Sequence, residues 1–174
     1  MIKLGDTHIF TGEFVLPAVQ RGAVFAMGNF DGMHPGHQGV LDLARAEAKR
    51  RGALLGMIVL EPLPRQFFKP DAEPFRLTTR EQRRRLAAGL GVDLLIELTF
   101  DAQLAQQSDR DFCQEWVARQ LGAGALAVGF DFSFGKGRAG TTDSLRALGA
   151  EFGFELLVTP EIEDVKGEKV SSSH

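Results

Sequence analysis

The sequence of 174 residues contains no tyrosine, one tryptophan and one cysteine. A lone cysteine cannot form an internal disulfide, which is typical of proteins in a reducing compartment, so we expect a cytoplasmic location. Cys113 follows Phe112 in an expected helix, where a small buried residue is favoured over a nucleophile. Phenylalanine, present 14 times, must supply most of any aromatic surface that a ligand contacts.

Long apolar runs and large blocks of one charge are also missing. No stretch approaches the roughly 20 apolar residues of a membrane-spanning helix, and the N-terminus lacks the pattern of a signal peptide. The net charge is −3, without the basic patch of a nucleic-acid-binding protein. We interpret the densest basic cluster, Arg80 with Arg83, Arg84 and Arg85, as a solvated helix face. We therefore expect neither a membrane nor a nucleic acid as a partner.

The residues that are present predict one globular domain over positions 1–174, with 44% hydrophobic and 25% charged residues. Apolar runs of strand length alternate with segments whose apolar residues recur at helical spacing. The expected strands cover residues 23–27, 53–60, 92–100, 125–129 and 154–158. Weaker extended signals lie at 8–10 and 13–15. This alternation predicts a doubly wound, mostly parallel α/β sheet.

Start and stop signals bound the expected helices between these strands. Pro35 suits a first helical position, and Thr78-Thr79-Arg80-Glu81 is typical of a capping box. Ser108 suggests a third helix start. Three glycines stand where helices are expected to end, at Gly91, Gly122 and Gly153.

The strand-to-helix junction from Gly28 to Gln38 carries the most unusual residues. His34 and His37 are three apart at the start of the expected helix, so their imidazoles lie on one face. Free backbone N–H groups and the helix dipole make this end an anion site. Gly32 and Gly36 allow a phosphate to approach the backbone closely. The junction therefore predicts a site for a nucleoside triphosphate.

His34-Pro35-Gly36-His37 resembles the HxGH signature of the nucleotidyltransferase superfamily, and the segment from Gly28 to Gln38 is similar to the narrower motif of bacterial FAD synthetases, the bifunctional riboflavin kinase/FMN adenylyltransferases. The resemblance implies a Rossmann-like nucleotidyltransferase fold and an FMN adenylyltransferase activity, which transfers AMP from ATP to FMN and releases FAD and pyrophosphate. His34 and His37 would stabilise phosphate charge as donors, not as nucleophiles. The residues implied in ATP binding here are Gly28, Asn29, Phe30, Asp31 and Gly36.

Magnesium is expected with the triphosphate, although no ligand set can be identified from the sequence. Asp31 is a candidate for holding a divalent cation or contacting the nucleotide, and an Asp at this place equally caps a turn. Both interpretations stay open.

Two further loops carry resemblance to the same family. Pro62-Leu63-Pro64 with Phe68 resembles its Pro-His-Pro segment, with Leu63 in place of the histidine. Gly129 to Gly135 is similar to its Gly-x-Asp-Phe-x-Phe-Gly segment. Loops after parallel strands share one sheet edge, so we expect both to lie beside the HxGH junction.

These two loops would bind the flavin, through apolar and aromatic walls. The residues implied are Pro62, Pro64, Phe68, Asp131, Phe134 and Arg138. For any one of these phenylalanines, a hydrophobic anchor under a loop is the alternative. For Lys136 and Arg138, the alternative is a solvated basic pair.

Ser171, Ser172 and Ser173 near the end of the chain resemble the family's Ser-Ser-Thr segment, which implies contacts with ATP phosphates. An unstructured terminus is the alternative. In the family an arginine and a riboflavin kinase domain follow, and we expect that domain to be absent here and to belong to a longer parent chain.

Two other functions remain open at this point. One is an adenylyl- or cytidylyltransferase acting on another acceptor. The other is a flavin- or nucleotide-binding module that is inactive through truncation. ATP and FMN are the expected small-molecule partners of the favoured function, and riboflavin phosphorylation is not predicted.

Overall fold

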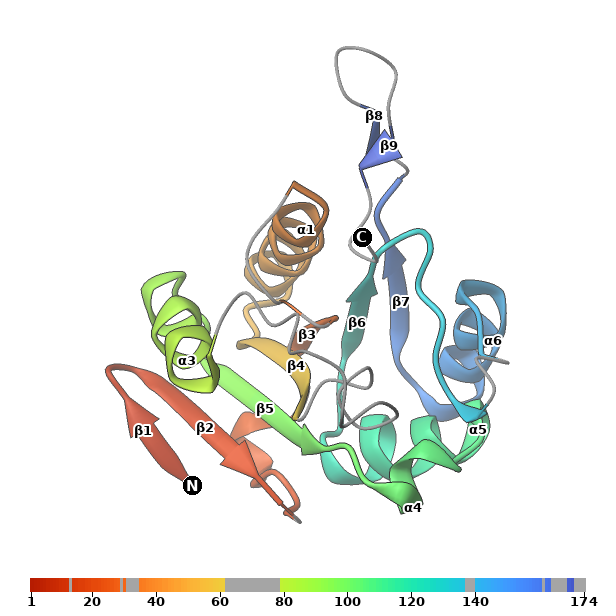
Figure 1. Ribbon diagram of the computed structural model, residues 1–174, viewed down its shortest axis with the longest axis horizontal. Coiled ribbons are helices and arrows are strands. Elements are labelled where there is room, and N and C mark those ends of the chain that lie inside the picture. The colour runs from red at the N-terminus through yellow and green to blue at the C-terminus, as the bar shows by residue number, and fades with distance from the viewer. Residues whose placement is uncertain are drawn as a thin grey trace.

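The computed structural model describes residues 1–12, 14–28, 30, 35–61, 79–136, 140–160, 162–163 and 169–170, with the backbone alone described at 35–37, 162–163 and 169–170. Its main sheet has seven strands in the order β1-β2-β5-β4-β3-β6-β7, with helices on both faces (Figure 1). The predicted doubly wound, mostly parallel α/β fold is confirmed.

The strands of the main sheet are β1 (Ile2–Leu4), β2 (Thr7–Thr11), β3 (Val24–Met27), β4 (Leu55–Glu61), β5 (Leu94–Thr99), β6 (Ala125–Val128) and β7 (Glu155–Val158). A two-stranded pair, β8 (Ile162–Glu163) and β9 (Lys169–Val170), stands apart from it. The helices are η1 (Ala18–Gln20), α1 (Pro35–Arg51), α3 (Arg80–Gly89), α4 (Ala102–Ala105), α5 (Asp109–Phe112), η2 (Cys113–Gln120) and α6 (Thr142–Phe152).

The strand order reverses at β3. The chain moves from β3 through α1 to β4 and then β5 on one side, and later returns to place β6 on the other side of β3. Ala26 of β3 is level with Met57 of β4 and with Ala127 of β6, and both pairings are parallel. In such sheets ligands bind at the carboxyl ends of the strands where the order reverses. The loops after β3 and β6 flank this point.

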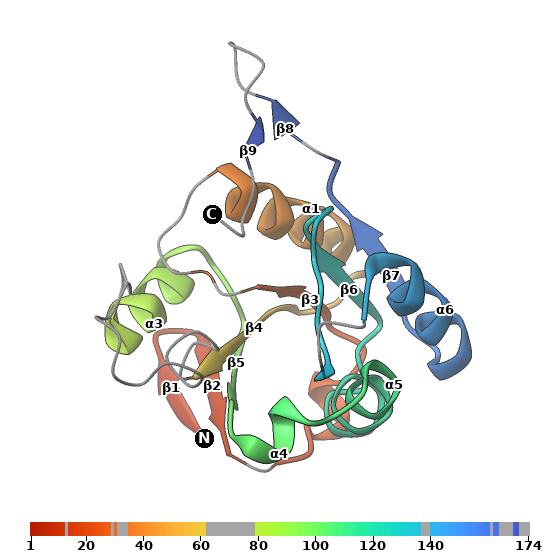
Figure 2. The ribbon, with the colours of Figure 1, turned by 45° about the vertical axis from the view of Figure 1, so that its right-hand side comes forward.

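The two faces of the sheet hold separate apolar layers. Side chains alternate along a strand, so Val24 and Ala26 pack under α1 and α3, while Phe25 and Met27 face the layer of α5, η2 and α6. Figure 2 shows α1 and α3 on one side of the sheet and α4 and α5 on the other. Burial on both faces explains why the central strands are apolar runs.

Most of the expected helix boundaries agree with the structure. α1 begins at Pro35, and Gly91, Gly122 and Gly153 follow helices with positive φ angles. The capping box of α3 lies one residue later than predicted: Thr79 Oγ1 accepts from Gln82 N at 3.1 Å, and the Gln82 side chain accepts from Thr79 N.

The helix after Ser108 has an unexpected second half. α5 starts at Ser108 as predicted, with Ser108 Oγ accepting from Asp111 N, and continues as the π-helix η2. Its wider turn closes with Leu121 N donating to Trp116 O at 2.9 Å. The spacing of apolar residues over so short a segment does not distinguish a π-helix from an α-helix, so the sequence did not predict the π-helix. No helix among the described residues is both long and apolar enough to cross a membrane.

Candidate functional site

The strand ends beside β3 form a common edge. Gly28 N donates to Ile58 O of β4 at 3.3 Å, and Thr159 N donates to Val128 O of β6 at 3.0 Å, so β3 stays bonded to β4, and β7 to β6, one residue past the ends of β3 and β7. The first turn of α1 contains no acidic side chain. The amino end of this helix therefore brings backbone N–H groups without an intrahelical acceptor, and the positive end of the helix dipole, next to the reversal of strand order.

Phe30 has a backbone conformation that a non-glycine residue rarely adopts. Its φ angle is 50°, and its side chain is 1% exposed within the layer under α1. A Cβ built at Gly28 would lie 3.3 Å from the Phe30 ring, so Gly28 leaves room for the ring to fold back. Strained backbone concentrates at functional sites. Because the ring is buried, a contribution of Phe30 to ATP binding would come from its backbone.

Phe134, predicted to bind flavin, is a buried anchor of the loop after β6. It is 9% exposed, and its ring packs edge-on against Phe112 of α5 with centroids 5.8 Å apart. Its backbone forms two hydrogen bonds with Gly140, where an added Cβ would meet the ring at 2.5 Å. The structure therefore favours the anchor interpretation for this residue.

Phe132 is better placed than Phe134 to offer an aromatic surface. It is partly buried and stacks on Phe134 with centroids 5.6 Å apart. Asp131 beside it is also partly buried. Lys136 N donates to Gln107 O at 2.9 Å, which ties the end of this loop to the segment before α5. Phe132 was not among the flavin contacts predicted from the sequence, although it lies within the motif that carried the resemblance.

The ion pair of Arg83 with Glu61 was not predicted from the sequence. Arg83 of α3 is 1% exposed, and its Nη2 donates to Glu61 Oε2 at 2.6 Å. Glu61 ends β4 at the same sheet edge. The prediction of a solvated arginine face was wrong for Arg83, because α3 packs this stripe, formed by Arg80, Arg83 and Arg84, against carboxylates of the sheet. The spacing of Arg80, Arg83 and Arg84 places them on one helix face but does not indicate what that face contacts.

Glu97 in β5 is the second carboxylate that pairs with this arginine stripe. Its side chain is fully buried and accepts from Arg84 Nη2 at 2.7 Å and from Arg80 Nη2 at 2.8 Å. Burial by itself would raise the pKa of Glu97, but the hydrogen bonds from Arg84 and Arg80 outweigh it and hold that pKa below its ordinary value. The hydrogen bond to Glu97 likewise raises the pKa of Arg84. This cluster is charged at neutral pH.

Most of the predicted site residues lie outside the described part of the chain. This holds for Asn29, Asp31, His34, Pro62, Pro64, Phe68, Arg138, Ser171, Ser172, Ser173 and the side chain of His37. Gly36 is the second residue of α1. The structure brings Gly28, Phe30 and the start of α1 to the sheet edge that also carries Asp131 and Phe134. The roles of all these residues stay predictions.

Other chemistry-bearing groups among residues that the structure describes do not form a competing site. Among the described residues, no three His, Cys, Asp or Glu side chains gather as they would around a metal ion. Burial, with a smaller effect of Asp109, raises the pKa of the Cys113 thiol to about 12, which fits a packed residue and not a nucleophile.

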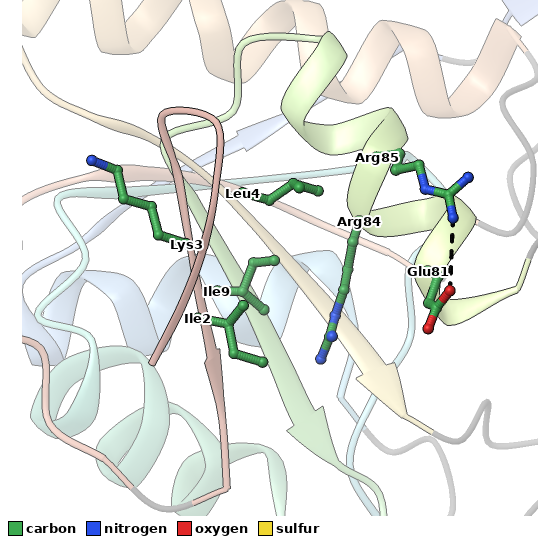
Figure 3. Close-up of a pocket in the computed structure, with 7 residues that line it drawn as sticks. All are labelled: Ile2, Lys3, Leu4, Ile9, Glu81, Arg84 and Arg85. Carbon is green, nitrogen blue, oxygen red and sulfur yellow. Dashed lines mark ion pairs between the residues drawn. The ribbon is translucent and has the colours of Figure 1, made fainter.

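A shallow pocket lies between β1 and α3, away from the predicted residues. Figure 3 shows Arg84 reaching from α3 over the sheet while Arg85 turns toward Glu81, its ion-pair partner at 3.7 Å. The lining residues are Ile2, Lys3, Leu4, Ile9, Glu81, Arg84 and Arg85. None of them belongs to the site predicted from the sequence.

Comparison with known proteins decides the family. The family described as FAD synthetase matches residues 16–174. The chain belongs to the FAD synthetase family. The family assignment covers the junction before α1, the loops after β4 and β6, and the final residues.

Named relatives agree with this family. The chain is 36% identical over 142 residues to the bifunctional riboflavin kinase/FMN adenylyltransferase of Escherichia coli K12, covering 82% of this chain and 45% of the relative. It is 38% identical over 153 residues to the enzyme of that name from Pseudomonas fluorescens, covering 88% and 49%. A FAD synthetase of Listeria monocytogenes is 34% identical, with 88% and 62% covered. The chain thus spans about half the length of the bifunctional relatives.

Solved structures share the fold. A Streptococcus pneumoniae structure titled as a macrolide-efflux protein has a TM-score of 0.76 at 25% identity, covering 95% of this chain and 53% of that one. A pantoate-beta-alanine ligase from Francisella tularensis has a TM-score of 0.53 at 13% identity, covering 95% and 72%. The second likeness concerns the fold alone.

Proposed function

We propose that this FAD synthetase family member is an FMN adenylyltransferase, which transfers AMP from ATP to FMN. The observation that carries the proposal is the convergence of the α1 amino end and the loop after β6 at the reversal of strand order. Family membership over residues 16–174 supplies the substrate class. The named relatives support the same activity.

In the proposed reaction a phosphate oxygen of FMN attacks the α-phosphorus of ATP. A new P–O bond forms, the bond from the α-phosphorus to the oxygen bridging the β-phosphate breaks, and that oxygen leaves on pyrophosphate with the electron pair. Charge grows on both the α-phosphate and the leaving group. The amides at the start of α1, with His34 and His37, stabilise this charge without a covalent intermediate.

Magnesium enters this proposal bound to the triphosphate. We assign the ion to the phosphates, with Asp31 as the candidate protein ligand. The flavin lies against the loop after β6, where Phe132 is partly exposed and Asp131 offers an acceptor for its polar edge. Ser171, Ser172 and Ser173 contact the ATP phosphates, Arg138 contacts phosphate, and Pro62, Pro64 and Phe68 line the flavin.

The same proposal concerns location and domain content. We propose a cytoplasmic protein, in keeping with one buried, unpaired cysteine. Adenylyl transfer, and not riboflavin phosphorylation, is the activity proposed for residues 1–174. The relatives are named for both activities, and this chain spans about half their length.

The test is a chromatographic assay for FAD with FMN, ATP and Mg²⁺, paired with detection of pyrophosphate. We expect FAD from the wild-type chain, and a loss of about a hundredfold or more in His37→Ala, the scale of removing one transition-state donor. His8→Ala is the matched control. His8 lies in β2 level with Leu94, the first residue of β5, so it is near the amino ends of the parallel strands, whereas the predicted site is at their carboxyl ends. It should keep wild-type turnover.

Three outcomes would contradict the proposal or part of it. Flavin or ATP binding without pyrophosphate release would identify a binding module. A thermal shift with another acceptor, and none with FMN, would identify a different nucleotidyltransferase. Wild-type turnover in His37→Ala would remove that side chain from the mechanism.

A further inference from the structure

We infer that Gly135 is a positioning residue for the flavin, acting through the loop after β6, and this inference rests on the proposed function. The structure describes residues 129–136 of this loop, which include Asp131 and Phe132, the proposed flavin contacts. Gly135 is the last glycine of the Gly-x-Asp-Phe-x-Phe-Gly motif. At this residue the backbone of the loop meets the backbone of α5.

The approach of the two backbones leaves no room for a side chain at position 135. A Cβ built at Gly135 would lie 3.0 Å from Asp109 N and 3.4 Å from Asp109 Cα, tighter than most real Cβ contacts. The φ angle of Gly135 is 80°, which favours glycine as well. The next residue adds a hydrogen bond at the same place, since Lys136 N donates to Gln107 O at 2.9 Å. Glycine therefore lets the loop lie directly on the start of α5.

The start of α5 is itself held in place. Ser108 Oγ accepts from Asp111 N at 3.0 Å, and Ser108 O accepts from Phe112 N at 3.0 Å. Arg110 joins α5 to α6, because its Nη1 donates to Glu151 Oε2 at 2.6 Å. Closely packed and bonded segments do not yield to an added methyl without a shift elsewhere. A side chain at position 135 would therefore displace the loop and leave α5 where it is.

A displacement at Gly135 reaches the flavin-facing surface through the neighbouring ring of Phe134. That ring packs against Phe112 of α5 with centroids 5.8 Å apart, and Phe132 stacks on Phe134 with centroids 5.6 Å apart. Because packed rings move together, the position of Phe132 depends on where the loop rests on α5. Gly135 thus sets the place of the aromatic surface that the flavin is proposed to contact.

Gly153 provides a matched contrast. Its φ angle is 92°, but a Cβ built there meets nothing within 4 Å. It follows α6 just before β7 begins, so it lies toward the amino ends of the parallel strands and away from the loop. Alanine at either glycine carries a similar cost in backbone conformation. Only alanine at position 135 also collides with α5.

The experiment measures FMN binding by flavin fluorescence, and steady-state kinetics, in Gly135→Ala, Gly135→Asn and Gly153→Ala. We expect the Kd and the KM for FMN to rise about threefold or more in Gly135→Ala. The KM for ATP and kcat should stay within about twofold, because binding of FMN weakens equally in the ground and transition states. Gly153→Ala should leave all four constants unchanged at a similar fall in Tm. Asparagine tolerates positive φ but keeps the Cβ, so Gly135→Asn should recover Tm and retain the weak FMN binding.

Phe132→Leu, alone and combined with Gly135→Ala, tests the route through the aromatic ring. Leucine keeps an apolar side chain and removes the flat surface, so Phe132→Leu should also raise the Kd for FMN. In that background Gly135→Ala should raise the Kd by a smaller factor than in the wild type, because both changes remove the same contact. Equal factors in the two backgrounds would overturn the action of Gly135 through Phe132.

The remaining outcomes separate this inference from the proposed function. No FAD from the wild-type chain would overturn the proposed function, while the FMN titrations of the Gly135 variants would still decide the role of Gly135. Wild-type FAD synthesis would leave the activity standing. The role of Gly135 would then be overturned by unchanged FMN constants in Gly135→Ala, by an equal rise in Gly153→Ala, or by wild-type FMN binding in Gly135→Asn.

Discussion

Gly56 illustrates how a single residue can decide whether two strands pack. It lies opposite Phe25 in the β3–β4 register, and the Phe25 ring crosses directly over it. A Cβ built at Gly56 would come within 2.2 Å of that ring, closer than any real contact. Phe25 is fully buried, so the ring has no room to move away. The glycine is required by space and not by backbone conformation.

We predict that Gly56→Ala lowers the free energy of unfolding by about 1–3 kcal/mol or more, because an extra methyl overfills a packed core. Urea unfolding followed by circular dichroism measures this change. Gly89→Ala is the matched control: Gly89 ends α3 with nothing within 4 Å of a built Cβ. That variant should be unchanged or up to about 1 kcal/mol more stable. Equal effects of the two substitutions would contradict the steric explanation.

At the scale of one element, α3 is joined to the sheet by ion pairs as well as by apolar contact. Its buried residues are Arg83 and Ala87, and its arginines pair with carboxylates in β4 and β5. A buried charge is tolerated only when it is paired and hydrogen-bonded. Each pair therefore specifies where α3 sits and so where its amino end lies at the sheet edge.

We predict that Glu97→Gln destabilises the protein by about 1–3 kcal/mol at neutral pH, the scale of a lost charged hydrogen bond. The pKa of Glu97 is lower in the folded state than its ordinary 4.5, so its stabilisation is present above pH 4.5 and is lost as pH falls through the folded pKa. The difference between wild type and Glu97→Gln should therefore be constant above about pH 5 and shrink below it.

The control for this prediction is Glu151→Gln. Glu151 pairs with Arg110 at 2.5 Å, but the two side chains are 45% and 53% exposed. Solvent and salt screen such a pair, so this variant should change stability little and lose even that effect at high ionic strength. An acid profile of Glu97→Gln that parallels the wild type down to pH 3 would show that Glu97 does not govern α3.

At the scale of elements, the sequence predicted where strands and helices occur better than it predicted what their side chains contact. The apolar runs at 53–60 and 125–129 became β4 and β6, and Pro35 opened α1, because these signals depend on neighbours along the chain. The burial of Arg83 depends on Glu61, 22 positions away, so local pattern alone assigned it to solvent. Helical spacing showed that the arginines share a face, and only packing shows what that face meets.

At the scale of the whole molecule, Cys113 reports on global stability. It is the one cysteine of the chain, is fully buried at the start of η2, and has a pKa raised to about 12 by burial and by Asp109. The thiolate is the reactive form, so both access and ionisation oppose modification of the folded state.

We predict that the reaction of Cys113 with a disulfide reagent at pH 8 is at least about a hundredfold slower in buffer than in denaturant, because opening requires loss of the packed layer. Its rate should rise with urea at the midpoint found by circular dichroism. Rapid reaction in buffer, without loss of ellipticity, would mean that η2 opens separately from the sheet.

The sequence by itself determined the alternation of strands and helices, most of the helix ends, and the motif that marks the family. These depend on residues a few positions apart, whose spacing is visible in a linear string. The tertiary structure decided that Phe134 anchors its loop against Phe112, that Phe30 folds under α1, and that Arg83 meets Glu61. Such contacts arise because the sheet brings distant segments to one edge, where packing and the cost of unpaired buried charge choose each side chain's environment.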